Sequence, residues 1–406
     1  MAILVINAGS SSVKFTLFGA DATTPIAGGI VERIGLGDPR FKYHTAAGLS
    51  LEQEVGVTNA DAAVGAIVSA LTDPQNGVLA SLREISAVGH RVVHGGEALT
   101  RPVVIDAAVK AVIAECARIA PLHNPPNLAG IEACERRIPH AVQVAVFDTA
   151  FHATIPPHAF LYGLPYRFYR QERIRRYGFH GISHKYVSEE AARFIGRPLA
   201  ELRLITCHLG NGCSMTAVLD GKSIDTSMGF TPLEGLIMGT RCGDLDPAVV
   251  LYLMEHQRLD LDAANHLLNK QSGMLGMAEI GSNDLRDVIE AQDRGNPQAG
   301  AALEAFCYRI KKYIGAYTAA MGGLDVLVFT AGVGENSPDV RRRVCQGLDT
   351  PGGLGIALDP HKNGLQTSLP RAIHAEQSRV RILVIPTNEE LEIARETRQL
   401  VAGLAS

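Results

Sequence analysis

Cysteine is scarce in this 406-residue sequence, and the cysteines that occur form no recognisable pattern. There are seven of them, an odd number, and no two have Cys-x-x-Cys spacing. The missing spacing argues against a zinc knuckle or a dithiol redox motif, and the odd number argues against a disulfide framework. We therefore expect reduced thiols, as in a cytoplasmic protein.

Long apolar runs and a strong excess of one charge are also missing. No apolar stretch reaches the length of a membrane-spanning helix, and the first residues lack the basic flank and long apolar core of a signal peptide. The net charge of −4 argues against a general nucleic-acid or membrane-surface binder. Charged residues make up 20% of the chain, too few for long disordered tails. These absences predict a globular, cytoplasmic protein with no nucleic-acid or membrane partner.

The pattern that is present is an alternation of strand-like apolar runs with helical stretches, which indicates an α/β fold. The length suggests two domains. Strands are predicted at 3–7, 13–18, 142–147, 202–208, 214–219, 326–330 and 381–386. Helices are predicted at 61–71, 106–119, 186–195, 247–255, 297–321 and 389–401, the last with Asn388 as its N-cap.

Two distant segments share one pattern of strand, small polar turn and strand. Residues 5–18 read VINAGSSSVKFTLF, and residues 205–225 read ITCHLGNGCSMTAVLDGKSID. Both are typical of hairpins with Gly, Asn and Ser at the tip. Two such hairpins favour a duplicated α/β domain with a cleft between the copies, divided near Ala150. The alternative is that any α/β protein contains several hairpins.

The common nucleotide-binding signatures are missing. Residues 216–223, TAVLDGKS, end like a P-loop but lack its first glycine, so that Asp220 and Gly221 are better interpreted as a hairpin turn. The segment GNGCSM lacks the third glycine of a dinucleotide fingerprint, and no protein-kinase catalytic loop is found. A nucleotide would therefore have to bind through another arrangement.

Three glycine-rich polar loops follow directly after apolar strands, at 7–12, 208–214 and 330–337. Glycine allows the backbone to approach a phosphate closely, and free N–H groups with Ser or Asn side chains can then bind it. Three such loops predict a phosphate site at the strand ends. Any one of them alone could be only a turn.

Two arginines stand in glycine-flanked segments, Arg91 in GHRVVHGGE and Arg241 in MGTRCGD. Arginine is the side chain best suited to bidentate capture of a carboxylate or phosphate, although a structural ion pair is the alternative for each. A basic run at 167, 170, 173, 175 and 176 is interpreted instead as a solvated or interface face.

Histidines and carboxylates complete the candidates. His123, His180 and His208 occupy loop-like, small-residue contexts that favour phosphate contact or proton transfer. Asp148 ends a strand and Glu389 follows another, which is where α/β proteins often hold Mg²⁺ or a reacting group. A first-turn role in a helix is the alternative for Glu389.

Taken together, nine motifs resemble the motif series of the acetate kinase family. They are VINAGSSSVKF, GHRVVHGGE, HNPPN, VFDTAFH, YGFHGISH, HLGNGCS, SMGFTPLEGLIMGTRCGDLDP, FTAGVGEN and IPTNEE, and they span residues 5–390. The resemblance implies an α/β fold of two duplicated actin-like (ribonuclease H-like) domains with a nucleotide cleft between them. It implies an N-terminal domain at 1–150, with a C-terminal helix at 387–406 packing back on it, and a nucleotide-binding domain at 151–386.

The same resemblance implies reversible, Mg²⁺-dependent transfer of the γ-phosphoryl group of ATP to acetate, with Mn²⁺ as a substitute metal, in a homodimer. It implies catalytic roles for Asp148, His180, Arg241, Arg91 and His123, and a metal site at Asn7 and Glu389 rather than Glu390. The residues implied for the nucleotide are Lys14, His208, Leu209, Gly210, Asn211, Gly212, Asp284, Leu285, Arg286, Gly332, Val333, Gly334, Glu335 and Asn336. The residues that correspond to the family's substrate pocket are Arg91, Val93, Leu122, Phe179 and Pro232.

Two alternatives stay open at this point. Similar kinases that prefer propionate tend to carry a smaller residue in place of Val93, so this valine favours acetate over propionate or another short acyl substrate. An actin-like scaffold that uses ATP only as a switch is the alternative of a different class. The arginines and the apolar pocket speak against it, because a scaffold has no need of a carboxylate site. Cys213 and Cys242 stand where the family often has serine, which we interpret as tolerated replacements.

Overall fold

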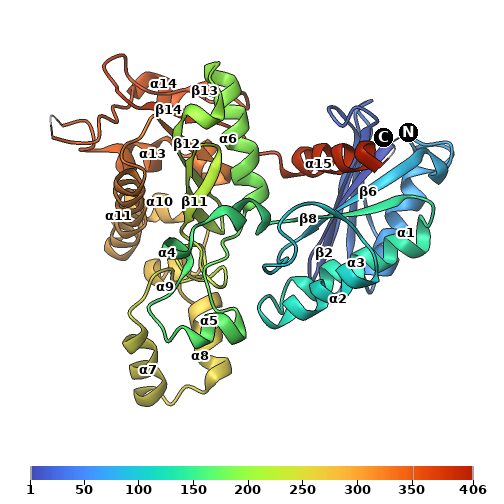
Figure 1. The fold of residues 1–406 in the computed structure, drawn as a ribbon, viewed down its shortest axis with the longest axis horizontal. Helices are drawn as coiled ribbons and strands as arrows, with labels where there is room; N and C mark the ends of the chain where they lie inside the picture. Colours follow the sequence, from blue (N-terminus) through green and yellow to red (C-terminus); the bar gives the residue numbers. More distant parts are fainter. Residues whose placement is uncertain (1, 351, 405–406) are drawn as a thin grey trace. The chain divides into compact units, whose positions relative to one another are not determined.

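The computed structural model describes residues 2–350 and 352–404, which divide into two compact units. The first unit contains residues 2–153 and 388–404, and the second contains residues 154–387. Each unit is built around one mixed β-sheet with helices against it (Figure 1). In the described part of the chain, no helix has both the length and the apolar character needed to cross a membrane.

The sheet of the first unit has the strand order β5-β4-β3-β2-β1-β6-β8-β7. Strands β1 to β5 pair antiparallel, whereas β1, β6 and β8 run parallel. The bounds are β1 Ala2–Ala8, β2 Ser12–Gly19, β3 Pro25–Glu32, β4 Arg40–Thr45, β5 Ser50–Glu54, β6 Ile85–Val92, β7 Val103–Val104 and β8 Val142–Phe147.

The sheet of the second unit has the order β11-β10-β9-β12-β14-β13. Its bounds are β9 Arg203–Leu209, β10 Cys213–Leu219, β11 Lys222–Thr226, β12 Val326–Thr330, β13 Arg371–Ala372 and β14 Arg381–Val384. This order repeats β3-β2-β1-β6-β8-β7 strand for strand, including the two parallel pairs in the middle and the antiparallel edge strand. The shared topology supports a duplication of one α/β unit.

Both faces of the first sheet are covered near β1, which explains why the apolar run of β1 is continuous rather than alternating. Helices α1 (Ala60–Leu71) and α3 (Asn124–Arg137) pack on one face, and α15 (Glu389–Leu404) packs on β1, β6 and β8 (Figure 1). Glycines allow both α3 and α15 to approach the sheet closely. A Cβ on Gly130 of α3 would lie 2.6 Å from Ala8 Cβ, and one on Gly89 would lie 2.4 Å from Thr397 Oγ1.

The remaining helix of the first unit is α2, Ala107–Glu115, capped by Asp106 and followed by a 3₁₀ turn at Cys116–Arg118. In the second unit, α6 packs against β9 and β12, and the long α11 packs against β10, α9 and α10. The bounds are α4 Pro157–Phe160, α5 Arg167–Glu172, α6 Gly181–Ile195, α7 Pro247–His256, α8 Leu261–Lys270, α9 Gly273–Ala278, α10 Leu285–Asp293, α11 Pro297–Ala320, α12 Ala331–Asn336, α13 Pro338–Cys345 and α14 Pro360–Gly364.

The predicted strands are found with boundaries shifted by at most two residues, and Asp220 with Gly221 forms the predicted hairpin turn, both at positive φ. Two predictions need correction. Helix α6 begins at Gly181, five residues before the predicted start, and residues 331–336 form helix α12 where a polar loop was expected. In both cases a small-residue segment continues directly into a helix that packs on the sheet, so tertiary packing outweighs the low helix propensity of glycine.

Candidate active site

Arg91 and Asp148 form the centre of the candidate site on the first unit. Arg91 lies near the end of β6, and Asp148 follows the neighbouring parallel strand β8, so both side chains emerge at the same edge of the sheet. Arg91 Nε donates to Asp148 Oδ1 at 3.1 Å and Nη2 donates to Oδ2 at 2.5 Å. Burial lowers the pKa of Arg91, but Asp148 and Glu389 raise it above its ordinary value, so the guanidinium stays charged.

Three further predicted residues of the first unit gather around this pair. Asn7 is the Cα partner of Lys14 across the β1–β2 hairpin, which places both side chains on one face of the sheet. Arg91 Nη1 lies 3.5 Å from Asn7 Oδ1, and Arg91 Nε lies 3.7 Å from Glu389 Oε2. Burial, together with Asp148 and Glu390, raises the pKa of Glu389 to about 7, although Arg91 acts in the opposite direction.

Two asparagines that the sequence analysis did not select hold this region in place. Asn124 and Asn127 both stand on the first turn of α3, just after His123. Asn127 Nδ2 donates to the carbonyl of Ala8 at 2.7 Å, and its Oδ1 accepts from the N–H of Val93 at 3.0 Å. Asn124 bonds both backbone groups of His94. The motif HNPPN contained the signal, because an asparagine on each side of a Pro-Pro pair suits a buried helix start.

The candidate site on the second unit is built around His180, which precedes α6 with φ +55°. His180 Nδ1 lies 2.9 Å from Ser214 Oγ on β10, and its ring stacks on that of His208 with centroids 4.2 Å apart. His184, which the sequence analysis did not select, is buried and contacts the same Ser214 Oγ through Nε2 at 2.7 Å. The predicted histidines 180 and 208 are thus brought together.

Arg241 lies beside His180 on the second unit. A Cβ on Gly212 would be 3.3 Å from His180 Cε1 and 3.7 Å from Arg241 Nη1, so the imidazole and the guanidinium flank this glycine. Arg241 Nη1 donates to the carbonyl of Pro232 at 3.1 Å. No carboxylate among the described residues forms a salt bridge with Arg241, and burial lowers its pKa from the ordinary value.

A cavity of about 840 Å³ opens on the second unit, next to the β9–β10 hairpin. Its volume lies in the range of small-molecule sites. Eight of the predicted nucleotide residues line it: Gly210, Asn211, Asp284, Leu285, Arg286, Gly332, Val333 and Asn336. Asn283 and Gly239 also line it and fix the hairpin tip, through Asn283 Nδ2 to Asn211 Oδ1 at 3.0 Å and the N–H of Gly239 to the Asn211 carbonyl at 2.9 Å.

Comparison with known proteins identifies the family. A sequence model of the acetokinase family matches residues 2–395. The chain belongs to the acetokinase family. It is 52% identical over 401 residues to an acetate kinase of Desulfitobacterium hafniense, covering 99% of both chains. It is 51% identical to an acetate kinase of Methanosarcina acetivorans, covering 98% of this chain and 97% of the relative.

Solved structures agree with this membership of the acetokinase family. The acetate kinase of Porphyromonas gingivalis superimposes with a TM-score of 0.93 at 44% identity, covering 98% of this chain and 99% of the other. A propionate kinase from Francisella tularensis gives a TM-score of 0.90 at 40% identity, with the same coverage. The predicted family, the α/β actin-like fold class and the enzyme class, a kinase with a carboxyl group as acceptor, are confirmed.

Other residues implied by the acetokinase resemblance lie elsewhere in the two units. His208, Leu209, Gly212, Gly334 and Glu335 do not line the cavity. Glu335 Oε1 accepts from the N–H of Thr387 at 3.1 Å, and so ties α12 to the end of the second unit. Among the substrate-pocket residues, Val93 and Leu122 belong to the first unit, whereas Phe179 and Pro232 belong to the second. Val93 and Phe179 are buried, while Leu122 is 59% exposed.

The prediction that the basic run at 167–176 forms a solvated or interface face needs correction. Arg167, Arg170 and Arg173 are exposed as predicted, but Arg175 is buried and Arg176 is half-buried. Arg175 lies 3.6 Å from the centroid of the Phe160 ring. The last two arginines of the run are therefore structural groups of the second unit rather than a solvated face.

Burial disfavours the thiolate form of Cys213 and Cys242. Cys213 is fully buried, and burial raises the pKa of its thiol to about 12. Burial also raises the pKa of Cys242. A raised pKa leaves little thiolate at neutral pH, so both are consistent with tolerated replacements in an acetokinase.

Proposed function

We propose that this chain transfers the γ-phosphoryl group of ATP to acetate, reversibly and in line. The observation that carries the proposal is Arg241, a desolvated guanidinium that has no acidic partner among the described residues and lies beside His180 at the β9–β10 hairpin. Such a cation is stabilised when an anion binds. The tip of the β9–β10 hairpin links Arg241 to the cavity proposed for ATP, because Gly210 and Asn211 line the cavity and Gly212 faces Arg241. A transferring phosphate would be expected at this tip.

The chemistry needs positioned positive charge more than covalent participation. In phosphoryl transfer the charge spreads over the equatorial oxygens, and arginine or histidine donors stabilise it. We assign this role to Arg91, Arg241 and His180, with His123 assisting. Acetate is already a competent nucleophile as a carboxylate, so no general base is required. Asp148 then orients Arg91, which agrees with the bidentate contact between them.

The residues around Arg91 suit a magnesium ion. Asn7 supplies an amide oxygen and Glu389 supplies a carboxylate. Burial raises the pKa of Glu389 to about 7, so a bound cation would stabilise its charged form. Among the described residues no group of three or more His, Cys, Asp or Glu side chains is arranged as a metal site. This is compatible with Mg²⁺, which typically takes one or two protein oxygens and completes its shell with phosphates and water. Mg²⁺ would neutralise part of the phosphate charge, and Mn²⁺ is proposed as a substitute.

Acetate is the proposed acceptor rather than propionate. Val93 is buried, with its N–H fixed by Asn127, so its side chain cannot easily make room for a longer acyl group. One methylene in an apolar pocket is worth about 1–3 kcal/mol, so the preference should be roughly tenfold to a hundredfold. A comparison of kcat/KM for acetate, propionate and butyrate would test it, and a larger value for propionate would contradict it.

A hydroxamate trap tests the reaction itself. The full chain with ATP, Mg²⁺, acetate and hydroxylamine should form acetyl hydroxamate and ADP in equal amounts, and omission of acetate should abolish both. ADP release without hydroxamate from any short carboxylate would favour the ATP-driven scaffold. Metal dependence is tested in the same assay by chelation followed by addition of Mg²⁺ or Mn²⁺.

We further propose a cytoplasmic homodimer without nucleic-acid or membrane partners. Helix α7 supports the dimer, because its sequence PAVVLYLMEH is largely apolar and yet it has no buried residue in the single chain. Exposed apolar residues on a monomer are typical of a covered interface. Light scattering of the purified chain would test the dimer, and a monomeric mass at micromolar concentration would contradict it.

A further inference from the structure

Arg176 lies in a cage of backbone carbonyls on the second unit. Its side chain is only 16% exposed. Nη1 donates to the carbonyls of Thr226, Ser227 and Met228, at 2.8, 3.2 and 3.1 Å. Three consecutive carbonyls can converge on one donor only where the chain leaves the extended conformation. Arg176 therefore holds the chain where β11 ends and the irregular 227–246 segment begins.

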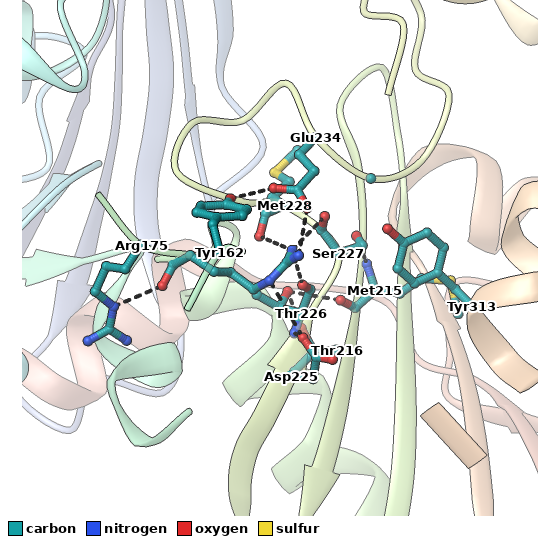
Figure 2. A network of polar contacts seen from close by, with 12 residues as sticks. Tyr162, Arg175, Met215, Thr216, Asp225, Thr226, Ser227, Met228, Glu234 and Tyr313 are labelled. Atoms are coloured by element: carbon teal, nitrogen blue, oxygen red, sulfur yellow. Dashed lines mark hydrogen bonds and ion pairs between the residues drawn. The ribbon is translucent and has the colours of Figure 1, made fainter. Parts of the chain in front are cut away.

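A carboxylate and a phenol complete the cage. Arg176 Nη2 donates to Glu234 Oε1 at 2.6 Å. The Tyr162 hydroxyl donates to Glu234 Oε2 at 2.5 Å (Figure 2) and accepts from the N–H of Phe230 at 2.8 Å. Gly229 is required for this approach, because a Cβ there would lie 1.7 Å from Glu234 Oε2 and 2.2 Å from the Tyr162 hydroxyl. We call these four residues, Tyr162, Arg176, Gly229 and Glu234, the arginine cage.

The arginine cage is connected to Arg241 on one side. It fixes both ends of the turn at 226–234, and Pro232 lies within that turn. The carbonyl of Pro232 is the oxygen that Arg241 Nη1 contacts at 3.1 Å. Since no carboxylate among the described residues orients Arg241, this carbonyl is its main positioning contact.

The arginine cage is connected to His180 on the other side. The carbonyl of Gly229 accepts from the N–H groups of Tyr177 and Gly178, at 3.0 and 3.2 Å. These residues directly precede Phe179 and His180 in the chain. The half-buried guanidinium of Arg176 thus holds two segments, and each of them contains a residue with a proposed role in the reaction.

We propose that Arg176, paired with Glu234, is a positioning residue that sets the geometry of Arg241 and His180 for phosphoryl transfer. This inference rests on the proposed function. Lysine cannot replace the arginine, because an ammonium lacks the planar fork that reaches three carbonyls and a carboxylate at once. A group that acts through Arg241 should affect turnover rather than nucleotide binding, since none of the cage residues lines the cavity.

The test compares Arg176→Lys and Tyr162→Phe with the matched control Arg170→Lys, an exposed arginine of the same run. ADP binding is titrated by calorimetry, and kcat is expressed per ADP-binding molecule, so that a fraction of misfolded protein does not count. We expect Arg176→Lys to lower this kcat at least tenfold with the Kd for ADP within twofold of wild type. Tyr162→Phe should lower it severalfold, and Arg170→Lys should not change it. If Arg176→Lys does not fold, Tyr162→Phe decides the matter.

A double-mutant cycle separates positioning from an independent effect. If Arg176 acts mainly through Arg241, adding Arg176→Lys to Arg241→Ala should change kcat by less than threefold further. If the losses in kcat of the two single variants multiply in the double variant, the inference is wrong. A normal kcat per ADP-binding molecule in both Arg176→Lys and Tyr162→Phe would also overturn it, while the activity of the wild type would stand. A wild-type chain that forms no acyl hydroxamate would overturn the proposed function, and this inference with it.

Discussion

The two proposed substrate arginines differ in how their charge is balanced. Arg91 is held by both oxygens of Asp148, which keep its pKa above the ordinary value. Among the described residues, Arg241 has only a carbonyl and the Met238 sulfur as partners, and burial lowers its pKa. Arg91 is therefore a preformed, compensated donor, whereas Arg241 gains most from an incoming anion. This difference suits Arg241 for the group whose charge changes during the reaction.

Substitution of Arg241 should remove turnover without harming the fold. We expect Arg241→Ala to lower kcat by about 10²–10³, the typical cost of losing one preorganised electrostatic donor. Stability should be unchanged or slightly higher, because a desolvated cation without an acidic partner is removed. Steady-state kinetics and urea unfolding check this, with the exposed Arg170→Ala as control. A kcat close to wild type would exclude the proposed role.

His90 should make the stability of the first unit depend on pH. It is buried on β6 with Nε2 2.8 Å from Gln143 Oε1, and burial lowers its pKa to about 4. Between pH 6.5 and 4 the unfolded chain binds a proton that the folded chain does not, so stability is complete above 6.5 and falls as the pH decreases. The loss between pH 7 and 5 should be about 2 kcal/mol.

The variant His90→Gln isolates this contribution, since glutamine places an amide near the position of Nε2 but does not titrate in this range. Urea unfolding followed by circular dichroism at pH 7 and 5 should show a smaller decrease in unfolding free energy for His90→Gln than for the wild type. Equal decreases in the two proteins would show that His90 does not cause the effect.

At the scale of elements, the repeated hairpins place chemistry at equivalent positions. Asn7 pairs with Lys14 in the first hairpin, and His208 pairs with Ser214 in the second, each one step from the last pair of its hairpin. The two pairs therefore occupy matching places in the duplicated sheet. The repeat thus provides the same strand-end position twice, with an amide and an ammonium group in the first copy and an imidazole and a hydroxyl in the second.

Helix α15 should be sensitive to the glycine beneath it. In Gly89→Ala the new Cβ would lie 2.4 Å from Thr397 Oγ1 and 2.9 Å from Ile393 Cγ2, so the helix has to shift. We expect a loss of about 1–3 kcal/mol in unfolding free energy, as for other overpacked sites. A lower kcat is expected as well. Helix α15 begins at Glu389, the proposed metal-site residue, so a shift of the helix would displace that carboxylate.

The matched control is Gly56→Ala, whose Cβ would meet nothing within 4 Å. Both variants replace hydrogen by methyl in the first unit, so a difference between them reports the contact with α15. Thermal or urea unfolding and kcat are measured for both. Equal stability and equal kcat in the two variants would contradict the proposed dependence on α15.

The sequence was sufficient for elements with a strong local period and insufficient where the backbone is irregular. The buried strands at 142–147 and 326–330 are found at the predicted residues, because β-branched runs bounded by polar turns have few alternatives. Arg176 could not be recognised as buried, because its partners are carbonyls of residues fifty or more positions away. The motif HNPPN suits a buried helix start, but the backbone partners of Asn127 lie 34 and 119 positions away, so its contacts with Val93 and Ala8 could not be predicted.

At the scale of the whole molecule, the candidate residues are divided between the two units. The first unit holds Asn7, Arg91, Asp148 and Glu389, and the second holds the cavity with Arg241 and His180. Nucleotide affinity and phosphoryl transfer should therefore be separable by substitution. This expectation depends only on which unit contains the residues that line the cavity. It holds for any arrangement of the two units in which the cavity binds ATP.

The decisive comparison uses one variant of each unit in the full chain. Asp148→Asn weakens the orientation of Arg91, so we expect kcat to fall by about 10² or more with the Kd for ADP within twofold of wild type. Gly332→Leu should weaken nucleotide binding instead. Gly332 lines the cavity, and a Cβ there meets no atom within 4 Å, so the larger side chain is free to occupy the space of the nucleotide. Its Kd for ADP should rise at least tenfold, with Gly332→Ala intermediate. If Asp148→Asn weakened ADP binding as much as Gly332→Leu, the cavity would not be an independent nucleotide site, and the division of labour between the units would be wrong.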